Sequence, residues 1–473
     1  MTQDAALDIL KTGSNVYLTG CAGSGKTYVL TRYLHYLNTH NTYVGVTAST
    51  GIASTQLSGM TINAWAGIGT KSDLTNADIN ELLKRKYLVK RFEHTQVLII
   101  DEISMLSNKT LEAVNKVCQA FKSSSRPFGG MQIVLCGDFF QLPPVTKFEA
   151  RNTKYETNSK HFENSNLGIV PDFDIRNSDL HYDFVYKSEL WEELDLKVCY
   201  LDKPYRQNDE RFVKLLTEIR ENNVTSYTWN TLRERFINPM TPGMTPTRLF
   251  THNSQADLVN TQELGKLSGE EHVYDLEFRG NEFLAEVMRK SSLIPEHLVL
   301  KERALVMFIK NSPDNGYVNG TMGRVVDFSM EGYPIVQTFD EREIKVRPAE
   351  WVIEDPSAGS GQVSDSDSAK VIQLPLRLAW AITIHKSQGM TLDAAEIDLG
   401  KSFVTGMGYV ALSRVRSLEG LRLRSINPTA LKVNEEVIDF DRELQLESER
   451  IEVELRDHKW NSENLGRIEH TVS

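Results

Sequence analysis

Closely spaced cysteines are missing from this chain of 473 residues. It has four cysteines, and no two of them form a C-x-x-C pair: Cys21, Cys118, Cys136 and Cys199. Disulfide frameworks and cysteine-based zinc modules need denser or paired cysteines, so this spacing argues against both classes. Cys21 stands inside a glycine-rich segment, where we expect its small side chain to be a filler.

Long hydrophobic runs are missing as well. The longest apolar stretches, such as "QVLII" at 96–100, are far shorter than the roughly 20 residues that a membrane-spanning helix needs. The first residues, "MTQDAALDIL", lack the basic start and apolar core of a secretory signal. We therefore expect no membrane partner and a reducing compartment. This would be a bacterial or phage-type cytoplasm at the nucleoid, or the nucleus or mitochondrion of a eukaryote.

An excess of basic residues, a common mark of nucleic-acid-binding domains, is also absent. Lysine and arginine number 53 against 64 acidic residues, which gives a net charge of −11. Residues 434–473 contribute −7 of this charge, because they hold 12 acidic and 5 basic residues. Global acidity therefore does not exclude a local positive groove in the rest of the chain. Any nucleic acid should be held in a channel.

A glycine-rich phosphate loop is the most specific feature that is present. The segment "GCAGSGKT" at 20–27 fits the pattern G-x-x-x-x-G-K-[ST], between an expected strand, "NVYL", and an expected helix at 28–37. Glycines let backbone N–H groups approach phosphates, and the helix adds its positive N-terminal end. In this pattern the lysine reaches the β- and γ-phosphates and the hydroxyl holds Mg²⁺. We predict that ATP is bound by Gly20, Ala22, Gly23, Ser24, Gly25, Lys26, Thr27 and Tyr28.

Two adjacent acids complete the expected catalytic set. The stretch "VLIIDE" leads from an apolar strand directly to Asp101 and Glu102. We expect Asp101, together with Thr27, to hold Mg²⁺, and Glu102 to orient and deprotonate the attacking water. ATP and Mg²⁺ are therefore the predicted cofactors. Arg206 and Arg414 are candidates for the positive charge that hydrolysis needs, although each alone could be an ordinary surface or ion-pair arginine.

Strands that alternate with helices predict an α/β fold with a parallel sheet wrapped by helices. Expected strands include 42–48, 96–100 and 131–138, and a helix is expected near 108–122. The polar segment 147–180 has little periodicity and predicts an inserted surface loop. Residues 301–353 alternate in a β manner with turn signals, which predicts a small barrel-like module.

Eight motifs occur in an order that resembles the Pif family of DNA helicases, in superfamily 1B with RecD and the phage Dda enzyme. The resemblance covers about residues 1–430, and its most specific parts are "GDFFQLPPV" and "TIHKSQGMTLD". The motifs are "GCAGSGKT", "VTASTGIAS", "GMTINAW", "LIIDEISML", "LCGDFFQLPPV", "LDKPYRQND", "WAITIHKSQGMTLD" and "YVALSRV".

This resemblance implies two RecA-like P-loop domains with parallel sheets, a small wedge region, and an SH3-like β module inserted in the second domain. The wedge region carries the basic run "KRKYLVKR" at 84–91, which could equally be a solvated helix face. The expected boundaries are 1–185 for the first domain including the wedge at 65–95, 186–300 and 370–433 for the second, 301–369 for the module, and 434–473 for an acidic helix or tail.

The resemblance also assigns residues. Gln3 would read adenine, Gln141 would sense the γ-phosphate, and Arg206 and Arg414 would reach across the cleft. Hydroxyls, amides and turn backbone can contact DNA phosphates without fixing sequence, lysine adds charge, and aromatic rings can stack on bases. Trp65 could equally be a core residue, and His385 a structural histidine. The expected DNA contacts are Thr50, Gly51, Thr61, Asn63, Trp65, Phe140, Thr383, His385 and Lys386.

Two positions depart from the family pattern. The family often has histidine at the position of Asn63 and glutamine at the position of Met407, which weakens those single contacts.

The implied activity is ATP-dependent 5′→3′ movement along single-stranded DNA and unwinding of duplex DNA, with guanine quadruplexes and RNA–DNA hybrids as further candidate substrates. Forked or structured DNA would be the partner in replication, recombination, repair or telomere maintenance, and the protein would be a monomer. A RecD-like recombination subunit and a phage replication helicase are alternatives within this class. Outside it, the alternatives are a nucleotide-switched ATPase that acts on a protein partner, and a strand-binding scaffold without catalysis.

Overall fold

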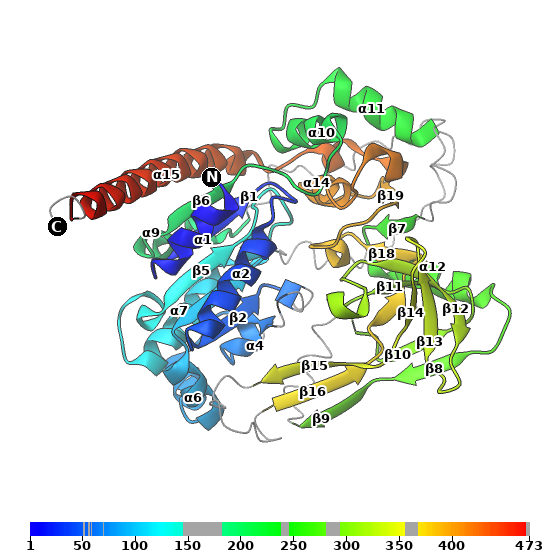
Figure 1. Ribbon diagram of the computed structural model, residues 1–473, viewed down its shortest axis with the longest axis horizontal. Coiled ribbons are helices and arrows are strands. Elements are labelled where there is room, and N and C mark those ends of the chain that lie inside the picture. The colour runs from blue at the N-terminus through cyan, green and yellow to red at the C-terminus, as the bar shows by residue number, and fades with distance from the viewer. Residues whose placement is uncertain are drawn as a thin grey trace.

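A computed structural model of the chain describes residues 1–50, 53–54, 57, 59–69, 71–144, 182–237, 246–280, 294–354 and 368–469. The predicted insertion at 147–180 and the predicted contact Gly51 lie outside these residues. Two separate parallel sheets and a group of antiparallel strands form the described part (Figure 1). The predicted α/β fold with parallel sheets is confirmed.

The first sheet has six parallel strands in the order β3-β2-β4-β5-β1-β6. Every residue of β1 and β4 is buried, as expected for parallel strands that are covered on both faces. The last strand, β6, pairs with β1 from Val16 to Gly20, so this sheet extends past the predicted domain boundary at 185. The strands are β1 (Val16–Gly20), β2 (Val44–Ala48), β3 (Met60–Thr61), β4 (Val97–Asp101), β5 (Gln132–Cys136) and β6 (Lys197–Leu201).

Capped amphipathic helices accompany this sheet. In α7, the Ser107 hydroxyl accepts from the Thr110 amide at the helix start, and one face of the helix is buried through Leu111, Val114 and Val117. The helix α2 is preceded by the N-cap residue Gly25, whose φ of 87° is readily adopted only by glycine. The helices are α1 (Gln3–Lys11), α2 (Lys26–Thr39), α4 (Ile62–Trp65), α7 (Asn108–Lys122) and α9 (Glu189–Glu193).

The predicted wedge region forms two short helices, α5 (Asn76–Leu82) and α6 (Lys86–His94). Its basic run does not present all of its charge to solvent. Arg91 is fully buried, and its Nη1 donates to the carbonyl oxygen of Trp65 at 2.6 Å. Lys84 and Lys90 are exposed. The run is therefore partly a core element that anchors α6.

The second sheet has four parallel strands in the order β18-β7-β19-β20. Its strands come from distant parts of the chain, because the antiparallel strands lie between β7 and β18 in sequence. The strands are β7 (Thr247–Phe250), β18 (Ala381–Thr383), β19 (Ala395–Leu399) and β20 (Leu421–Ile426). The helices are α10 (Glu210–Arg220), α11 (Ser226–Ile237), α12 (Asn253–Gly265) and α14 (Met407–Leu412).

The inserted β module is a five-stranded antiparallel sheet with a small core of its own, which includes Val306, Phe308 and Val336. It extends beyond the predicted range of 301–369 at both ends. Its sheet ends in β17, and further antiparallel pairs begin at β8. The strands are β8 (His272–Asp275), β9 (Glu277–Gly280), β10 (His297–Leu300), β11 (Leu305–Phe308), β12 (Met322–Phe328), β13 (Pro334–Thr338), β14 (Glu343–Lys345), β15 (Ala349–Glu354), β16 (Ser368–Gln373) and β17 (Leu376–Leu378).

The acidic C-terminal segment is a helix, α15 (Glu435–Glu469), but it is not solvated on all sides. It packs along β6 of the first sheet (Figure 1). One face is buried at helical spacing, through Val437, Asp441, Leu444, Ser448 and Ile451. Because two of these five residues are polar, the stripe is hard to recognise in the sequence.

None of the helices in the described ranges is both long and apolar enough to cross a membrane.

Candidate active site

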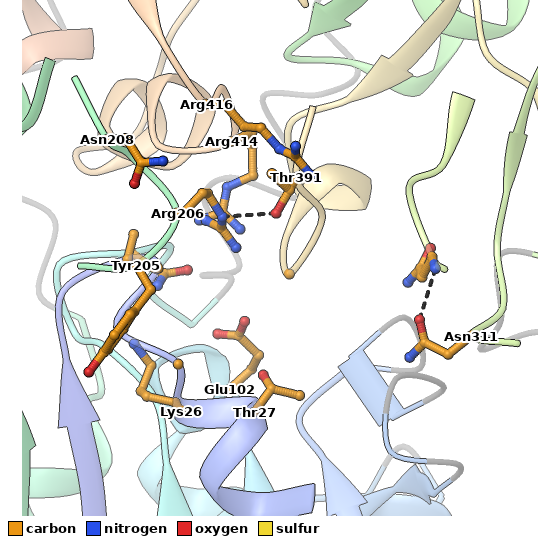
Figure 2. A pocket seen from close by; sticks show the side chains of 16 residues that line it. Lys26, Thr27, Glu102, Tyr205, Arg206, Asn208, Asn311, Thr391, Arg414 and Arg416 are labelled. Atoms are coloured by element: carbon orange, nitrogen blue, oxygen red, sulfur yellow. Dashed lines mark hydrogen bonds between the residues drawn. The ribbon is translucent and has the colours of Figure 1, made fainter. Parts of the chain in front are cut away.

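A pocket of about 520 Å³ lies where the first sheet faces the segments that lead into and out of the second (Figure 2). This volume suits a ligand of nucleotide size. Predicted residues that line it are Ala22, Gly23, Gly25, Lys26, Thr27, Glu102, Gln141, Arg206 and Arg414. Other lining residues, which the sequence did not single out, are Tyr205, Asn208, Asn311, Asn319, Gly389, Thr391 and Arg416.

The phosphate loop lies on one wall of this pocket. Lys26 Nζ donates within the loop, to the carbonyl oxygens of Gly20 at 2.8 Å and Cys21 at 3.2 Å. A Cβ atom on Gly23 would approach Arg206 Cβ within 2.7 Å, and the φ of Gly23 is 84°. Glycine is therefore required where the loop meets the segment that carries Arg206.

Two side chains flank the outer end of the loop. Gln3 Nε2 donates to the carbonyl oxygen of Ser24 at 3.0 Å, which ties α1 to the loop. The Tyr205 amide donates to the carbonyl oxygen of Gly23 at 2.9 Å, and the Tyr205 ring is 53% exposed. An exposed ring at the edge of such a pocket can stack on a base. The aromatic residue next to Arg206 in "KPYRQND" was the available signal in the sequence.

The two acids stand at the end of β4. Asp101 Oδ1 accepts from the Glu102 amide at 2.8 Å. Glu102 has a φ of 51°, an uncommon value for a residue with a side chain, which indicates strain at this strand end. Burial, and next the charge of Asp101, raise the pKa of Glu102 to about 7. Glu102 Oε2 is buried and has no hydrogen-bond partner within the described ranges.

These oxygens fit a magnesium ion. Mg²⁺ usually takes one or two protein oxygens and completes its shell with waters and substrate phosphates. Across the described part of the chain, no group of three or more His, Cys, Asp or Glu residues could hold a metal by itself. Thr27 and Asp101 supply a hydroxyl and a carboxylate of the required kind.

The arginines lie on the wall opposite the phosphate loop (Figure 2). Arg206 Nε donates to the Thr391 hydroxyl at 3.0 Å, and its Nη1 donates to the Ser413 carbonyl oxygen at 3.0 Å. Arg414 is 2% exposed, and its Nε donates to the Val410 carbonyl oxygen at 2.9 Å.

The two guanidinium groups make the pocket positive. Burial, and next the charge of Arg414, lower the pKa of Arg206 to about 9. Burial also lowers the pKa of Arg414. Within the described ranges neither of them forms an ion pair with a carboxylate. The pocket is therefore prepared for an anion.

Gln141 also lines the pocket. Its Nε2 donates to Asp138 Oδ2 at 3.4 Å, and its Oε1 is buried with no hydrogen-bond partner among the residues that the structure describes.

Some predicted ATP-site residues do not line the pocket. Asp101, Gly20 and Ser24 are not among its lining residues, and Gln3 contacts the loop through the Ser24 carbonyl oxygen. Tyr28 is 56% exposed, and the Arg32 guanidinium lies 5.6 Å from the centre of its ring.

Three predicted DNA contacts of the first domain form hydrogen bonds with nearby residues of the chain. The Thr50 hydroxyl accepts from the Ala53 amide at 3.3 Å, and the Thr61 hydroxyl caps α4. Asn63 Nδ2 donates to the Gly69 carbonyl oxygen at 2.9 Å. All three residues are partly accessible, so they stay candidates.

Two predicted base-stacking residues are wrong for this conformation. Trp65 is 1% exposed and packs edge-on against Phe92, at 4.7 Å between ring centres. Phe140 is 3% exposed, and its ring lies 4.2 Å from the Arg220 guanidinium. Both rings belong to the hydrophobic core. The sequence did not reveal these partners, which lie 27 and 80 positions away.

The predicted contacts of the second domain form one group after β18. The buried Thr383 hydroxyl donates to Asn253 Oδ1 at 3.3 Å and accepts from the Lys386 amide at 3.4 Å. Burial, and next the charge of Arg377, lower the pKa of Lys386. Burial also lowers the pKa of His385. A phosphate anion that bound beside this partly buried lysine and the neighbouring arginine would stabilise their positive charges.

Comparison with known proteins gives a consistent result. The sequence model of the family described as PIF1-like helicase matches residues 3–171. The chain is 39% identical to a protein named ATP-dependent DNA helicase Pif1 from Psychrobacter sp. (strain PRwf-1), over 92% of this chain and 69% of that one. It spans 64–65% of the length of three vertebrate PIF1 helicases, from Xenopus laevis, Danio rerio and Homo sapiens, that it matches.

Solved structures agree with the sequence match. Bacteroides sp Pif1 in complex with ADP-AlF4 has a TM-score of 0.74 and 29% identity, over 94% of this chain and 96% of that one. Bacteroides Pif1 bound to ssDNA has a TM-score of 0.61 and 29% identity, over 93% and 95%. Since the likeness in sequence and in fold extends over nearly all of its length, the chain belongs to the PIF1-like helicase family.

Proposed function

We propose that this chain is an ATP-dependent DNA helicase. One observation carries the proposal. A single pocket is lined by the phosphate loop and Glu102, which follow β1 and β4 of the first sheet, by Arg206 on the segment between β6 and α10, and by Arg414 between α14 and β20 of the second sheet. A nucleotide in this pocket would join the two sheets, and its hydrolysis would release them.

The phosphates of ATP would lie on the loop at 20–27. Lys26 would exchange its two carbonyl partners for β- and γ-phosphate oxygens. Gln3 and Tyr205, at the outer end of the loop, would bind the adenine. Thr27 and Asp101 would hold Mg²⁺, which supplies positive charge to the phosphates when it is bound.

Hydrolysis would begin at Glu102. Its unpaired, buried Oε2 would accept a proton from a water as the water oxygen bonds to the γ-phosphorus. The bond from the γ-phosphorus to the bridging oxygen breaks, and ADP keeps that oxygen. Arg206 and Arg414 would stabilise the charge that develops on the transferred group, and Gln141 would contact the γ-phosphate.

Movement would follow from this geometry. The arginines and Gln141 reach the γ-phosphate only when the two walls are close together, so ATP favours closure and hydrolysis favours opening. If the grip on DNA alternates between the two domains, each cycle advances the chain by about one nucleotide. Melting one base-pair step costs about 1.4 kcal/mol on average. A 5′→3′ direction is the expectation from the family.

Single-stranded DNA would cross both domains, held through its phosphates by Thr50 on one side and by Thr383, His385 and Lys386 on the other. Forked or otherwise structured DNA is the proposed substrate, the chain is proposed to act as a monomer, and a DNA-containing compartment is its proposed location.

Strand displacement tests the proposal directly. A labelled duplex with a 5′ single-stranded tail should open when ATP and Mg²⁺ are added, and the same duplex with a 3′ tail should not. The Glu102→Gln variant should open neither of them. If the wild-type chain opened neither substrate, the helicase proposal would be rejected.

The rate of ATP hydrolysis with and without an oligonucleotide distinguishes a helicase from the main alternative. A helicase should hydrolyse ATP faster when single-stranded DNA is present, because the strand and the nucleotide bind to the same two domains. A rate that ignored the oligonucleotide would favour a nucleotide-switched ATPase with a protein partner.

A further inference from the structure

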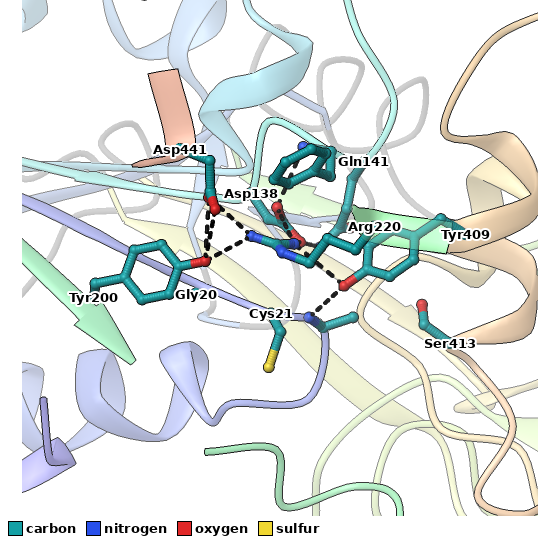
Figure 3. Close-up of polar contacts among 12 residues, drawn as sticks. Gly20, Cys21, Asp138, Gln141, Tyr200, Arg220, Tyr409, Ser413 and Asp441 are labelled. Carbon is teal, nitrogen blue, oxygen red and sulfur yellow. Dashed lines mark hydrogen bonds and ion pairs between the residues drawn. The ribbon is translucent and has the colours of Figure 1, made fainter. Parts of the chain in front are cut away.

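A buried arginine joins parts of the chain that are far apart in sequence (Figure 3). Arg220 is the last residue of α10, and its side chain is 10% exposed. Its Nη1 donates to the two carboxylate oxygens of Asp138 at 2.8 and 2.9 Å, and to the Tyr409 hydroxyl at 3.2 Å. Its Nη2 donates to the Tyr200 hydroxyl and to Asp441 Oδ1, each at 3.1 Å.

Two of these contacts lead to the proposed ATP site. Asp138 is fully buried and accepts from Gln141 Nε2 at 3.4 Å. The Tyr409 hydroxyl accepts from the Ala22 amide, inside the phosphate loop, at 3.1 Å. Arg220 therefore contacts both Asp138, which binds the predicted γ-phosphate sensor Gln141, and Tyr409, which binds the phosphate loop.

The other two contacts lead to the C-terminal helix. Asp441 lies on the buried face of α15 and accepts from the Tyr200 hydroxyl at 3.1 Å and from Gln445 Nε2 at 2.7 Å. The Tyr200 amide, in β6, donates to the Ser448 hydroxyl, about two turns further along the helix than Asp441, at 3.0 Å. Polar contacts therefore fix the position of α15 beside Arg220, in addition to its apolar stripe.

Because the guanidinium is planar, its partners can fix the orientation of the Arg220 side chain. It offers two edges, and here each edge is held by a different buried carboxylate. If only one of the two carboxylates were present, the Arg220 guanidinium could still turn about its hydrogen bonds to that carboxylate. With Asp138 and Asp441 on both edges, the orientation of Arg220 is fixed, and the orientation of Asp138 is fixed with it.

We infer that Arg220 is a positioning residue through which α15, by way of Asp441, sets the placement of Gln141 and of the phosphate loop. Asp441 itself does not line the pocket. The inference rests on the proposed ATPase function. It implies that the acidic C-terminal helix helps to position residues of the nucleotide site.

The test is the preference for ATP over ADP. The Asp441→Asn change removes one charge and keeps the size of the side chain. In a Glu102→Gln background, where hydrolysis should stop, the dissociation constants for ATP and ADP are measured separately by titration. Because only ATP has the γ-phosphate that Gln141 would contact, we expect the ratio of the two constants to shift about 3- to 10-fold toward ADP, or about 0.7–1.4 kcal/mol.

This ratio separates positioning from simple loss of structure. Unfolded protein lowers the number of binding sites but leaves the ratio unchanged. Tyr200→Phe is the second variant, in case Asp441→Asn folds poorly, and it should shift the ratio in the same direction. Asp439→Asn is the matched control, because Asp439 lies on the same helix, is exposed, and pairs with Arg442 at 2.9 Å. It should not change the ratio.

A Gln141→Ala change completes the design. If α15 acts through Gln141, Asp441→Asn should shift the ratio little further in the Gln141→Ala background. The inference would be overturned if the shifts of the ratio caused by Asp441→Asn and Gln141→Ala were fully additive. An unchanged ratio in both Asp441→Asn and Tyr200→Phe would also overturn it. In that case a wild-type chain that opens DNA leaves the helicase proposal standing, whereas a wild-type chain that neither opens DNA nor binds ATP refutes the proposal itself.

Discussion

At the scale of single residues, burial decides the chemistry of this pocket. Glu102 and Arg414 are ordinary charged residues in the sequence, yet at this pocket Arg414 is buried and Glu102 is half-buried. Burial penalises the charged form of each, which raises the pKa of an acid and lowers the pKa of a base. The site therefore holds an acid that can accept a proton near neutral pH and arginines that favour an anion.

Glu102→Gln should stop hydrolysis and retain ATP binding, since glutamine keeps the size of the side chain and cannot accept the proton. We expect kcat to fall at least about 100-fold, within the range that general base catalysis contributes. Phosphate release and nucleotide titration measure the two properties. Normal turnover in this variant would show that another group activates the water.

The pH dependence of kcat/KM gives an independent check, because this ratio reports the ionisation of the free enzyme. The pKa of Glu102 is raised to about 7, so the carboxylate form is present above that pH and is lost as the pH falls. We expect kcat/KM to fall about tenfold per pH unit below about pH 7. A flat profile down to about pH 5, with the fold intact by circular dichroism, would contradict the assignment.

At the scale of elements, α15 shows how a highly charged helix can be part of a core. Its buried stripe has the spacing of one helix face, and most acidic side chains between residues 435 and 455 are exposed. Leu444 is 6% exposed, while Leu446 on the same helix is 56% exposed.

Leu444→Ala should therefore destabilise the chain by about 2–4 kcal/mol, since it removes a packed side chain and leaves a cavity. Leu446→Ala is the matched control and should change the free energy of unfolding by less than about 0.5 kcal/mol. Urea unfolding measures both. Equal effects of the two changes would mean that α15 does not dock on β6 in solution.

At the scale of the whole molecule, net acidity and DNA binding have to be reconciled. With a net charge of −11, the chain cannot attract DNA by its overall field. In the proposed function, binding would come from local contacts such as the group around Lys386, and each phosphate that is neutralised would release counterions.

Single-stranded DNA affinity should therefore fall steeply with salt, and Lys386→Ala should reduce the slope of log K against log salt by about 0.7. Lys11→Ala, at the exposed end of α1, should leave the slope unchanged. The slope is measured by fluorescence anisotropy at salt concentrations from about 50 to 200 mM, a range over which affinity that depends on phosphate contacts falls steeply. If both variants had the slope of the wild-type chain, Lys386 would not contact phosphate.

The sequence by itself determined the phosphate loop, the two acids at the end of β4, the alternation of strands and helices, and the family. These features depend on short segments whose backbone and chemistry are local, such as the glycines at 20–25 and the apolar run before Asp101. Only the tertiary structure decided that Trp65 and Phe140 are buried, that the first sheet ends in β6, that Asn311 and Asn319 reach the pocket, and that Arg220 binds Asp441. Each of these depends on contacts between distant segments, which no local pattern encodes.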